Sequence, residues 1–195
     1  MRDEARQAGI ALYVASAYRD FNRQLAIWSG KFNGQRPLLD PWGASLDHAK
    51  LHESALIDAI LTWSALPGAS RHHWGSDFDV MDAAAIGPGE QARLVAQEYE
   101  PGGRFERLSG WLDSNMGRFG FFRPYAAWRG GVRPEPWHLS HAPVSVPALQ
   151  VLSLEVLREA IEESGLPGKQ TVLARLPELY ERYVLAVDEP GASYG

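Results

Sequence analysis

Four residues of this chain have the types and spacing of a hydrolytic metal centre. His72 and Asp79 are seven residues apart, and His138 follows much later, with Glu135 three residues before it. A hydrolytic zinc centre needs three protein ligands and one free position for a water molecule. It also needs a carboxylate that does not bind the metal and can take the proton of that water. These residues therefore predict a metal-dependent hydrolase.

Residue types and spacing alone leave this assignment open. His73 has the same chemistry as its neighbour His72, and Asp77 and Asp82 compete with Asp79 for the carboxylate role. Gly75 gives the backbone the freedom to bring a histidine and an aspartate to one point. An ordinary set of surface or core polar residues is an equally good interpretation at this stage.

Composition limits the class of protein. The chain has 195 residues, of which 45% are hydrophobic and 22% charged, as expected for one sizeable core with or without a helical appendage. A net charge of −5 argues against nucleic acid or an anionic membrane surface as a partner. No apolar run is long enough to span a bilayer. Because there is no cysteine, any zinc site must use imidazole and carboxylate ligands.

The first part of the chain is expected to alternate helices with one strand. Ser16 is predicted to cap the second helix, with Asp20 in its first turn and Gly30 at its end. The expected elements are a helix at 2–8, a strand at 10–15, an amphipathic helix up to 30, a loop at 33–49 and a helix at 51–61.

The second part is expected to supply the remaining strands and a helical end. The expected elements are a strand at 78–81, an irregular segment at 86–103, a helix at 105–116, a strand from 120 and a return strand at 135–140. Two further helices, 154–161 and 172–183, form a hairpin around a turn at 165–168, and Pro177 is expected to kink or restart the second.

The fold predicted from these elements is α+β. A small, mainly antiparallel sheet carries the metal site, helices flank it, and a helical hairpin lies at the C-terminal end. Residues 1–143 are expected to form the catalytic domain, and residues 144–195 a helical extension packed on the same domain.

Four segments resemble, in the same order, the motifs of the D-alanyl-D-alanine carboxypeptidase family of zinc peptidases, the VanY-like group with the hedgehog/DD-peptidase fold. The resemblance runs from about residue 16 to residue 141. The matching segments are Ser70–Asp79 for Ser-x-His-x-x-Gly-x-Ala-x-Asp, Glu135–His138 for Glu-x-Trp-His, Ser16–Gln24 for Ser-x-Tyr-Arg-…-Gln, and Trp111–Asn115 with Gly120–Phe121 for Trp-Leu-x-x-Asn and Gly-Phe. One departure is clear, since Asp77 stands where the family usually has Ala.

The resemblance implies a role for each matching residue. It implies that His72, Asp79 and His138 bind one Zn²⁺ per chain and that Glu135 is the catalytic base. It also implies that Arg19 contacts the substrate or the transition state, as a planar guanidinium suits a carboxylate or an oxyanion. Without the resemblance, a surface salt bridge to Asp20 or a neighbouring acid is the better interpretation of Arg19.

Further substrate contacts are expected at Gln24, Ser70 and Trp137. Gln24 either hydrogen-bonds the substrate backbone or lies on a solvated helix face, and Ser70 either contacts a ligand or belongs to a turn. Trp137 is expected to pack against the metal centre, with Trp74 and Trp128 as other candidate walls of the cleft.

The second carboxylate near the predicted metal, that of Asp77, has three interpretations. By strand alternation it shares a face with Asp79. It binds a basic group of the substrate, raises the local negative charge, or points to solvent.

The resulting hypothesis is a zinc-dependent D-alanyl-D-alanine carboxypeptidase acting on peptidoglycan stem peptides. An endopeptidase or an L,D-carboxypeptidase acting on the same peptides is the alternative within the class. A non-catalytic zinc-containing binding module is the alternative outside it, although such a module has no use for a free base at Glu135. A structural protein with chance motifs is a third interpretation.

The resemblance also implies a place in the cell. The family indicates the periplasm or cell envelope, whereas the charged start of the chain, without an apolar signal core, leaves the cytoplasm open. The sequence does not indicate an oligomeric state.

Overall fold

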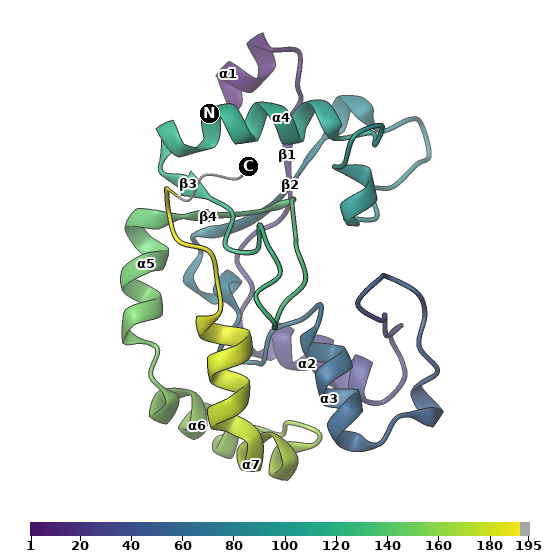
Figure 1. Cartoon of the computed structure of the whole chain (residues 1–195), viewed down its shortest axis with the longest axis vertical. Coiled ribbons are helices and arrows are strands. Elements are labelled where there is room, and N and C mark those ends of the chain that lie inside the picture. Colours follow the sequence, from purple (N-terminus) through teal and green to yellow (C-terminus); the bar gives the residue numbers. More distant parts are fainter. Residues whose placement is uncertain (192–195) are drawn as a thin grey trace.

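A four-stranded antiparallel sheet lies in the upper half of the molecule as drawn in Figure 1. The structure is a computed structural model that describes residues 1–191. The sheet has the strand order β1-β2-β4-β3. Its strands are β1 (Leu12–Ser16), β2 (Asp77–Asp82), β3 (Phe121–Phe122) and β4 (His138–His141). The predicted α+β fold with a small antiparallel sheet is confirmed.

The pairing of β2 with β4 places the functional side chains on one face of the sheet. Asp79 lies directly opposite His138, and Asp77 lies opposite Ser140. Because alternate residues of a strand point to the same side, these four side chains share one face. The sheet register therefore brings together residues that are about sixty positions apart in the sequence.

The opposite face of the sheet is apolar and is covered by two helices, α1 (Arg2–Gln7) and α4 (Glu106–Asn115). Leu108 and Leu112, one turn apart on α4, are completely buried. They join Val80 and Leu139 of the sheet in one hydrophobic cluster. This cluster, called the sheet core below, supports the strands from behind.

A second hydrophobic cluster lies in the lower half of the molecule and is called the helical core below (Figure 1). It contains Trp28, Ile57, Leu157 and Leu176, all completely buried, from four different helices. The helices are α2 (Phe21–Phe32), α3 (Glu53–Leu61), α6 (Leu154–Glu163) and α7 (Lys169–Tyr180). The C-terminal helical hairpin thus shares a core with the two helices that precede the metal motif.

Some predicted boundaries in the first part of the chain are wrong. Ser16 ends β1 and does not cap α2; the cap is Asp20, whose carboxylate accepts a hydrogen bond of 2.7 Å from the backbone N–H of Arg23. The helix continues past Gly30 to Phe32. The return strand begins at His138, so Glu135 lies in the turn before it.

The C-terminal part differs in two ways. An unpredicted helix, α5 (Ala142–Val151), joins the sheet to the hairpin, so the expected boundary after residue 143 falls within its first turn. The sequence does not indicate this helix, because Pro143 is usually a sign that a helix ends. Proline nevertheless fits the first turn of a helix, where no intrahelical donor is needed. Helix α7 runs through Pro177 to Tyr180 without a restart. The last four residues of the predicted extension, 192–195, lie outside the described part.

Within residues 1–191, no helix combines the length and the apolar character that crossing a membrane requires.

Candidate metal centre

The structure brings His72, Asp79 and His138 together, although they come from three separate elements. His72 lies on a 3₁₀ turn (Arg71–Trp74), Asp79 on β2 and His138 on β4. His72 Nε2 lies 3.5 Å from Asp79 Oδ2, and His138 Nδ1 lies 3.5 Å from Asp79 Oδ1. One candidate ligand atom from each residue lies within 4.8 Å of the other two.

The donor set and its burial fit a zinc ion. All three side chains are buried, and Asp79 Oδ1 has no hydrogen-bond partner. A buried carboxylate oxygen without a partner is costly unless a cation satisfies it. Two imidazoles and one carboxylate are ligands that zinc accepts in catalytic sites, with a further position left for water.

His72 is held so that one nitrogen faces Asp79. Its Nδ1 lies 2.9 Å from the carbonyl oxygen of Ala17 and donates to it, which leaves the lone pair of Nε2 free. Gly75, in the left-handed conformation with φ +69°, ends the 3₁₀ turn and leads the chain into β2. Burial lowers the pKa of His72 to about 3, so this imidazole is neutral and ready to bind a metal.

His138 and Asp79 respond differently to their surroundings. Burial opposes a charge on His138, but hydrogen bonds to the carboxylates of Asp77 and Glu135 raise its pKa to about 10. Burial raises the pKa of Asp79 to about 6. Without a metal, His138 is therefore protonated beside these carboxylates, and zinc must displace its proton.

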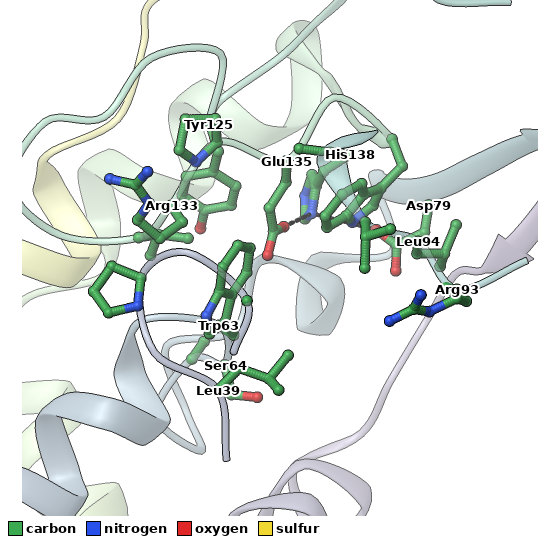
Figure 2. Close-up of a pocket in the computed structure, with 18 of the residues that line it drawn as sticks. Leu39, Trp63, Ser64, Asp79, Arg93, Leu94, Tyr125, Arg133, Glu135 and His138 are labelled. Atoms are coloured by element: carbon green, nitrogen blue, oxygen red, sulfur yellow. Dashed lines mark ion pairs between the residues drawn. The ribbon is translucent and has the colours of Figure 1, made fainter. Parts of the chain in front are cut away.

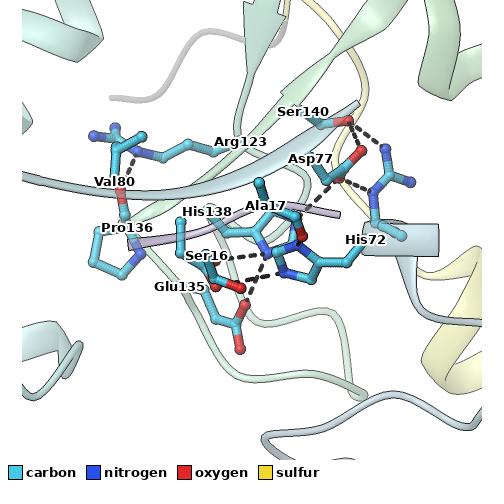
Figure 3. A network of polar contacts seen from close by, with 12 residues as sticks. Ser16, Ala17, His72, Asp77, Val80, Arg123, Glu135, Pro136, His138 and Ser140 are labelled. Atoms are coloured by element: carbon cyan, nitrogen blue, oxygen red, sulfur yellow. Dashed lines mark hydrogen bonds and ion pairs between the residues drawn. The ribbon is translucent and has the colours of Figure 1, made fainter. Parts of the chain in front are cut away.

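Glu135 lies beside the three candidate ligands. Its Oε2 is 3.3 Å from His138 Nδ1, the nitrogen that also faces Asp79 (Figure 3). The backbone N–H of Glu135 donates to the carbonyl of Tyr125 at 2.9 Å, and the Glu135 carbonyl accepts from the N–H of His138 at 3.0 Å. Two backbone bonds thus fix the turn that presents this carboxylate to the metal position.

Asp77 is fully buried behind the candidate ligands. It is completely inaccessible to solvent and is not among the residues that line the cleft. It does not point to solvent, which was one interpretation of the sequence, and no substrate group can reach it without a rearrangement. Its partners are inside the protein.

Arg19 is tied to the turn that carries His72. The N–H of Arg19 donates to the carbonyl of His72 at 3.2 Å, and the ring of His73 donates from Nδ1 to the carbonyl of Arg19 at 2.5 Å. The second ring nitrogen of His73 accepts from the N–H of Gly68, so His73 has no nitrogen left for a metal. The surface salt bridge from Arg19 to Asp20 does not form, because Asp20 caps α2.

Gln24 is buried and holds Arg19. Its Oε1 accepts from Arg19 Nη1 at 2.8 Å, and its Nε2 donates to the carbonyl of Ala65 at 2.7 Å. Both ends of the amide are therefore used inside the protein, and Gln24 is not among the residues that line the cleft. Ser70 and Trp137 are buried, and both line the cleft.

The candidate centre opens into a cleft of about 450 Å³ (Figure 2). Sequence reasoning missed Tyr125, whose ring lies edge-on to that of His138 with 5.2 Å between the centroids. It also missed Arg133, Trp42 and Trp63, which line the cleft. Of the three tryptophans expected there, Trp137 lines the cleft, but Trp74 and Trp128 do not. These residues lie in loops, where no periodic pattern marks them.

Comparison with known proteins places this chain among peptidases. The sequence profile of the family described as "VanY: D-alanyl-D-alanine carboxypeptidase" matches residues 1–144. An uncharacterized protein of Haemophilus influenzae is 32% identical over 126 residues, which is 64% of this chain and 96% of that protein. A D-alanyl-D-alanine carboxypeptidase of Enterococcus faecalis is 33% identical over 140 residues, which is 70% of this chain but only 42% of that enzyme.

A solved structure has the same fold. VanYB in complex with D-alanine-D-alanine is 24% identical, with a TM-score of 0.50 over 88% of this chain and 75% of that chain. Since the family profile covers well over half of the sequence, this chain belongs to the VanY family of D-alanyl-D-alanine carboxypeptidases.

Proposed function

We propose that this protein is a zinc-dependent D-alanyl-D-alanine carboxypeptidase that hydrolyses the terminal peptide bond of peptidoglycan stem peptides. One observation carries the proposal: His72, Asp79 and His138 converge at one point, and the carboxylate of Glu135 lies beside them, 3.3 Å from His138 Nδ1. The family supports the reaction class. The chain spans less than half of the E. faecalis relative, so the activity rests on the site itself.

The residues of the site have separable roles in this reaction. Bound zinc would polarise the scissile carbonyl and lower the pKa of the attacking water. Glu135 takes a proton from that water on its carboxylate and passes it to the leaving amine. Arg19, held by Gln24, binds negative charge on the substrate, either at the terminal carboxylate or at the carbonyl oxygen.

The charges of the cleft suit an anionic peptide. Arg19, Arg93 and Arg133 line it, and none of them forms an ion pair with a carboxylate within residues 1–191. In Figure 2, Arg93 and Arg133 lie toward opposite ends of the cleft, with His138 and Glu135 between them. Stem peptides carry a terminal carboxylate and further carboxylates upstream, so arginines on both sides of the scissile bond favour them. We propose that the protein acts in the cell envelope, where this substrate lies.

The experiment measures zinc content and product release together. The purified protein is incubated with a synthetic stem pentapeptide ending in D-Ala-D-Ala, with the corresponding tetrapeptide, and with a cross-linked muropeptide, and products are identified by mass. We expect about one equivalent of zinc, its loss in His138→Ala, and release of D-alanine from the pentapeptide.

Each other result contradicts the proposal in a defined way. Release from the tetrapeptide alone would make the protein an L,D-carboxypeptidase, and cleavage of the cross-link alone would make it an endopeptidase. Bound zinc without any turnover would leave a binding module. A purified protein that contains no zinc and binds none would show that these residues do not form a zinc centre.

A further inference from the structure

The residue that departs from the family motif, Asp77, lies directly behind a candidate metal ligand. Its Oδ1 is 2.9 Å from His138 Nε2, the ring nitrogen that faces away from the metal position (Figure 3). The other ring nitrogen, Nδ1, faces Asp79 and Glu135. The imidazole of His138 is therefore held between Asp77 on one side and the metal position on the other.

Asp77 is itself fixed by donors on both of its oxygens. Arg71 Nε donates to Oδ1 at 2.8 Å, while Ser76 Oγ and Ser140 Oγ donate to Oδ2 at 2.8 and 3.1 Å. Arg71 also donates from Nη2 to Ser140 Oγ at 2.6 Å. A buried carboxylate with this many donors stays ionised and cannot rotate, so its position relative to His138 is set by the fold.

Arg71 is held as firmly as the carboxylate that it pairs with. Only 4% of its side chain is exposed, and its guanidinium lies 4.8 Å from the ring centroid of Trp74 and 5.8 Å from that of Phe122. Replacing a buried ion pair by apolar groups is often neutral or favourable for stability. Stability alone is thus a weak reason for a buried carboxylate at position 77.

We propose that Asp77 is a positioning residue for zinc binding, acting through His138. Its carboxylate accepts the Nε2–H bond, which fixes the tautomer and ring orientation that leave Nδ1 for the metal. A carboxylate behind a ligating histidine also makes the other nitrogen a stronger donor, and loss of such a partner typically weakens metal binding about 10- to 100-fold. This inference rests on the zinc site of the proposed function.

A matched pair of double variants separates this role from a purely structural one. Arg71→Met/Asp77→Asn and Arg71→Met/Asp77→Ala both lack the buried charges. Only asparagine keeps an oxygen that can accept from His138 Nε2, while its NH₂ group can donate to Ser76 or Ser140. Zinc affinity is measured by competition with a chelator at fixed pH, and folding by circular dichroism.

We expect Arg71→Met/Asp77→Ala to bind zinc at least about tenfold more weakly than Arg71→Met/Asp77→Asn, and the wild-type protein to bind zinc most tightly. If the two double variants have the same zinc affinity, within about twofold, Asp77 only neutralises Arg71, and the inference is wrong. If wild type binds no zinc, the proposed function fails as well; if it binds zinc and the pairs are equal, only the role of Asp77 fails.

A second measurement needs no variant. Wild-type protein labelled with ¹⁵N-histidine and loaded with ¹¹³Cd is observed by NMR. We expect cadmium coupling to Nδ1 of His138 and Nε2 of His72, with the proton of His138 on Nε2. Cadmium coupling to Nε2 of His138 would overturn the proposal, because Asp77 could not then hold that nitrogen. Neither measurement depends on hydrolysis.

Discussion

The carboxylate of Glu135 lies 3.3 Å from Nδ1 of His138, the ring nitrogen that also faces Asp79. Nδ1 of His138 thus lies near both Glu135, which would take the proton of the water, and Asp79, which would bind the metal. The turn between residues 135 and 138 is closed by a backbone hydrogen bond of 3.0 Å, so this proximity is a property of the local fold.

The first prediction concerns the base. Glu135→Ala should lower kcat by about 10²- to 10⁴-fold, because proton transfer from the attacking water loses its acceptor. Zinc content should stay at one equivalent, since the three ligands remain. D-alanine release and zinc content are measured on the same sample, with His138→Ala as the metal-free control. Turnover at the wild-type rate would show that another group is the base.

The second prediction concerns pH and zinc affinity. The pKa of His138 is raised to about 10 by its neighbouring carboxylates, so below that pH its proton must leave before zinc binds. Affinity should therefore rise about tenfold per pH unit between pH 6.5 and 8.5. Burial raises the pKa of Asp79 to about 6, so a second proton is displaced below that pH and the slope steepens. Chelator competition over this range and below pH 6 measures both slopes, and a flat profile between pH 6.5 and 8.5 would contradict a protonated His138.

The third prediction concerns the hydrogen bond from Arg19 to Gln24. Arg19→Ala should reduce kcat/KM by about 10- to 100-fold through loss of a charged hydrogen bond to the substrate. Gln24→Leu should reduce it less, by misplacing the guanidinium. Because Gln24 acts through Arg19, the double variant should be no worse than Arg19→Ala alone.

The matching control for this cycle is Asn22→Ala, which changes an exposed residue on the same helix and should leave kcat/KM unchanged. Strictly additive losses in the double variant would mean that Gln24 contacts the substrate independently, which is one of the two interpretations that the sequence allows.

The fourth prediction concerns the C-terminal helices. We propose that residues 144–191 unfold together with the rest of the chain, because Leu157 and Leu176 pack in one cluster with Trp28 and Ile57. Leu176→Ala should reduce the free energy of unfolding by about 2–5 kcal/mol in a single transition. Urea denaturation measures this, with the half-exposed Val156→Ala as a control expected to change it by less than about 1 kcal/mol. Two separate transitions would make the helices an independent unit.

The sequence could predict the types of the site residues but not their partners. A zinc hydrolase motif contains histidines and acids, whereas the choice between His72 and His73 depends on the backbone groups that each ring contacts. His73 is occupied by Gly68 and Arg19, and His72 is oriented by Ala17. None of these three contacts leaves a periodic pattern in the sequence. The same holds for Gln24, because the sequence of a helix does not show whether a glutamine on it contacts a substrate or an arginine.

The fold shows a similar division between what was predictable and what was not. Helices with regular apolar spacing, such as α4 and α6, were predicted because their buried faces repeat every three or four residues. Helix α5 has little such repetition and contains Pro143 and Pro147, so local rules pointed to a break. Contacts with β4 and with the 3₁₀ turn at Arg71–Trp74 override those rules, and such contacts are not visible in a local pattern.

The two hydrophobic cores have a consequence for how this enzyme type diversifies. Strands supported by the sheet core carry Asp79 and His138, whereas Leu39 and Trp42 on the opposite wall belong to a loop, 33–49, that adjoins the helical core. Changes of length or residue in that loop would leave the strands that bear these ligands undisturbed. We therefore expect substitutions in this loop to change which peptides the cleft accepts, with little effect on the positions of Asp79 and His138.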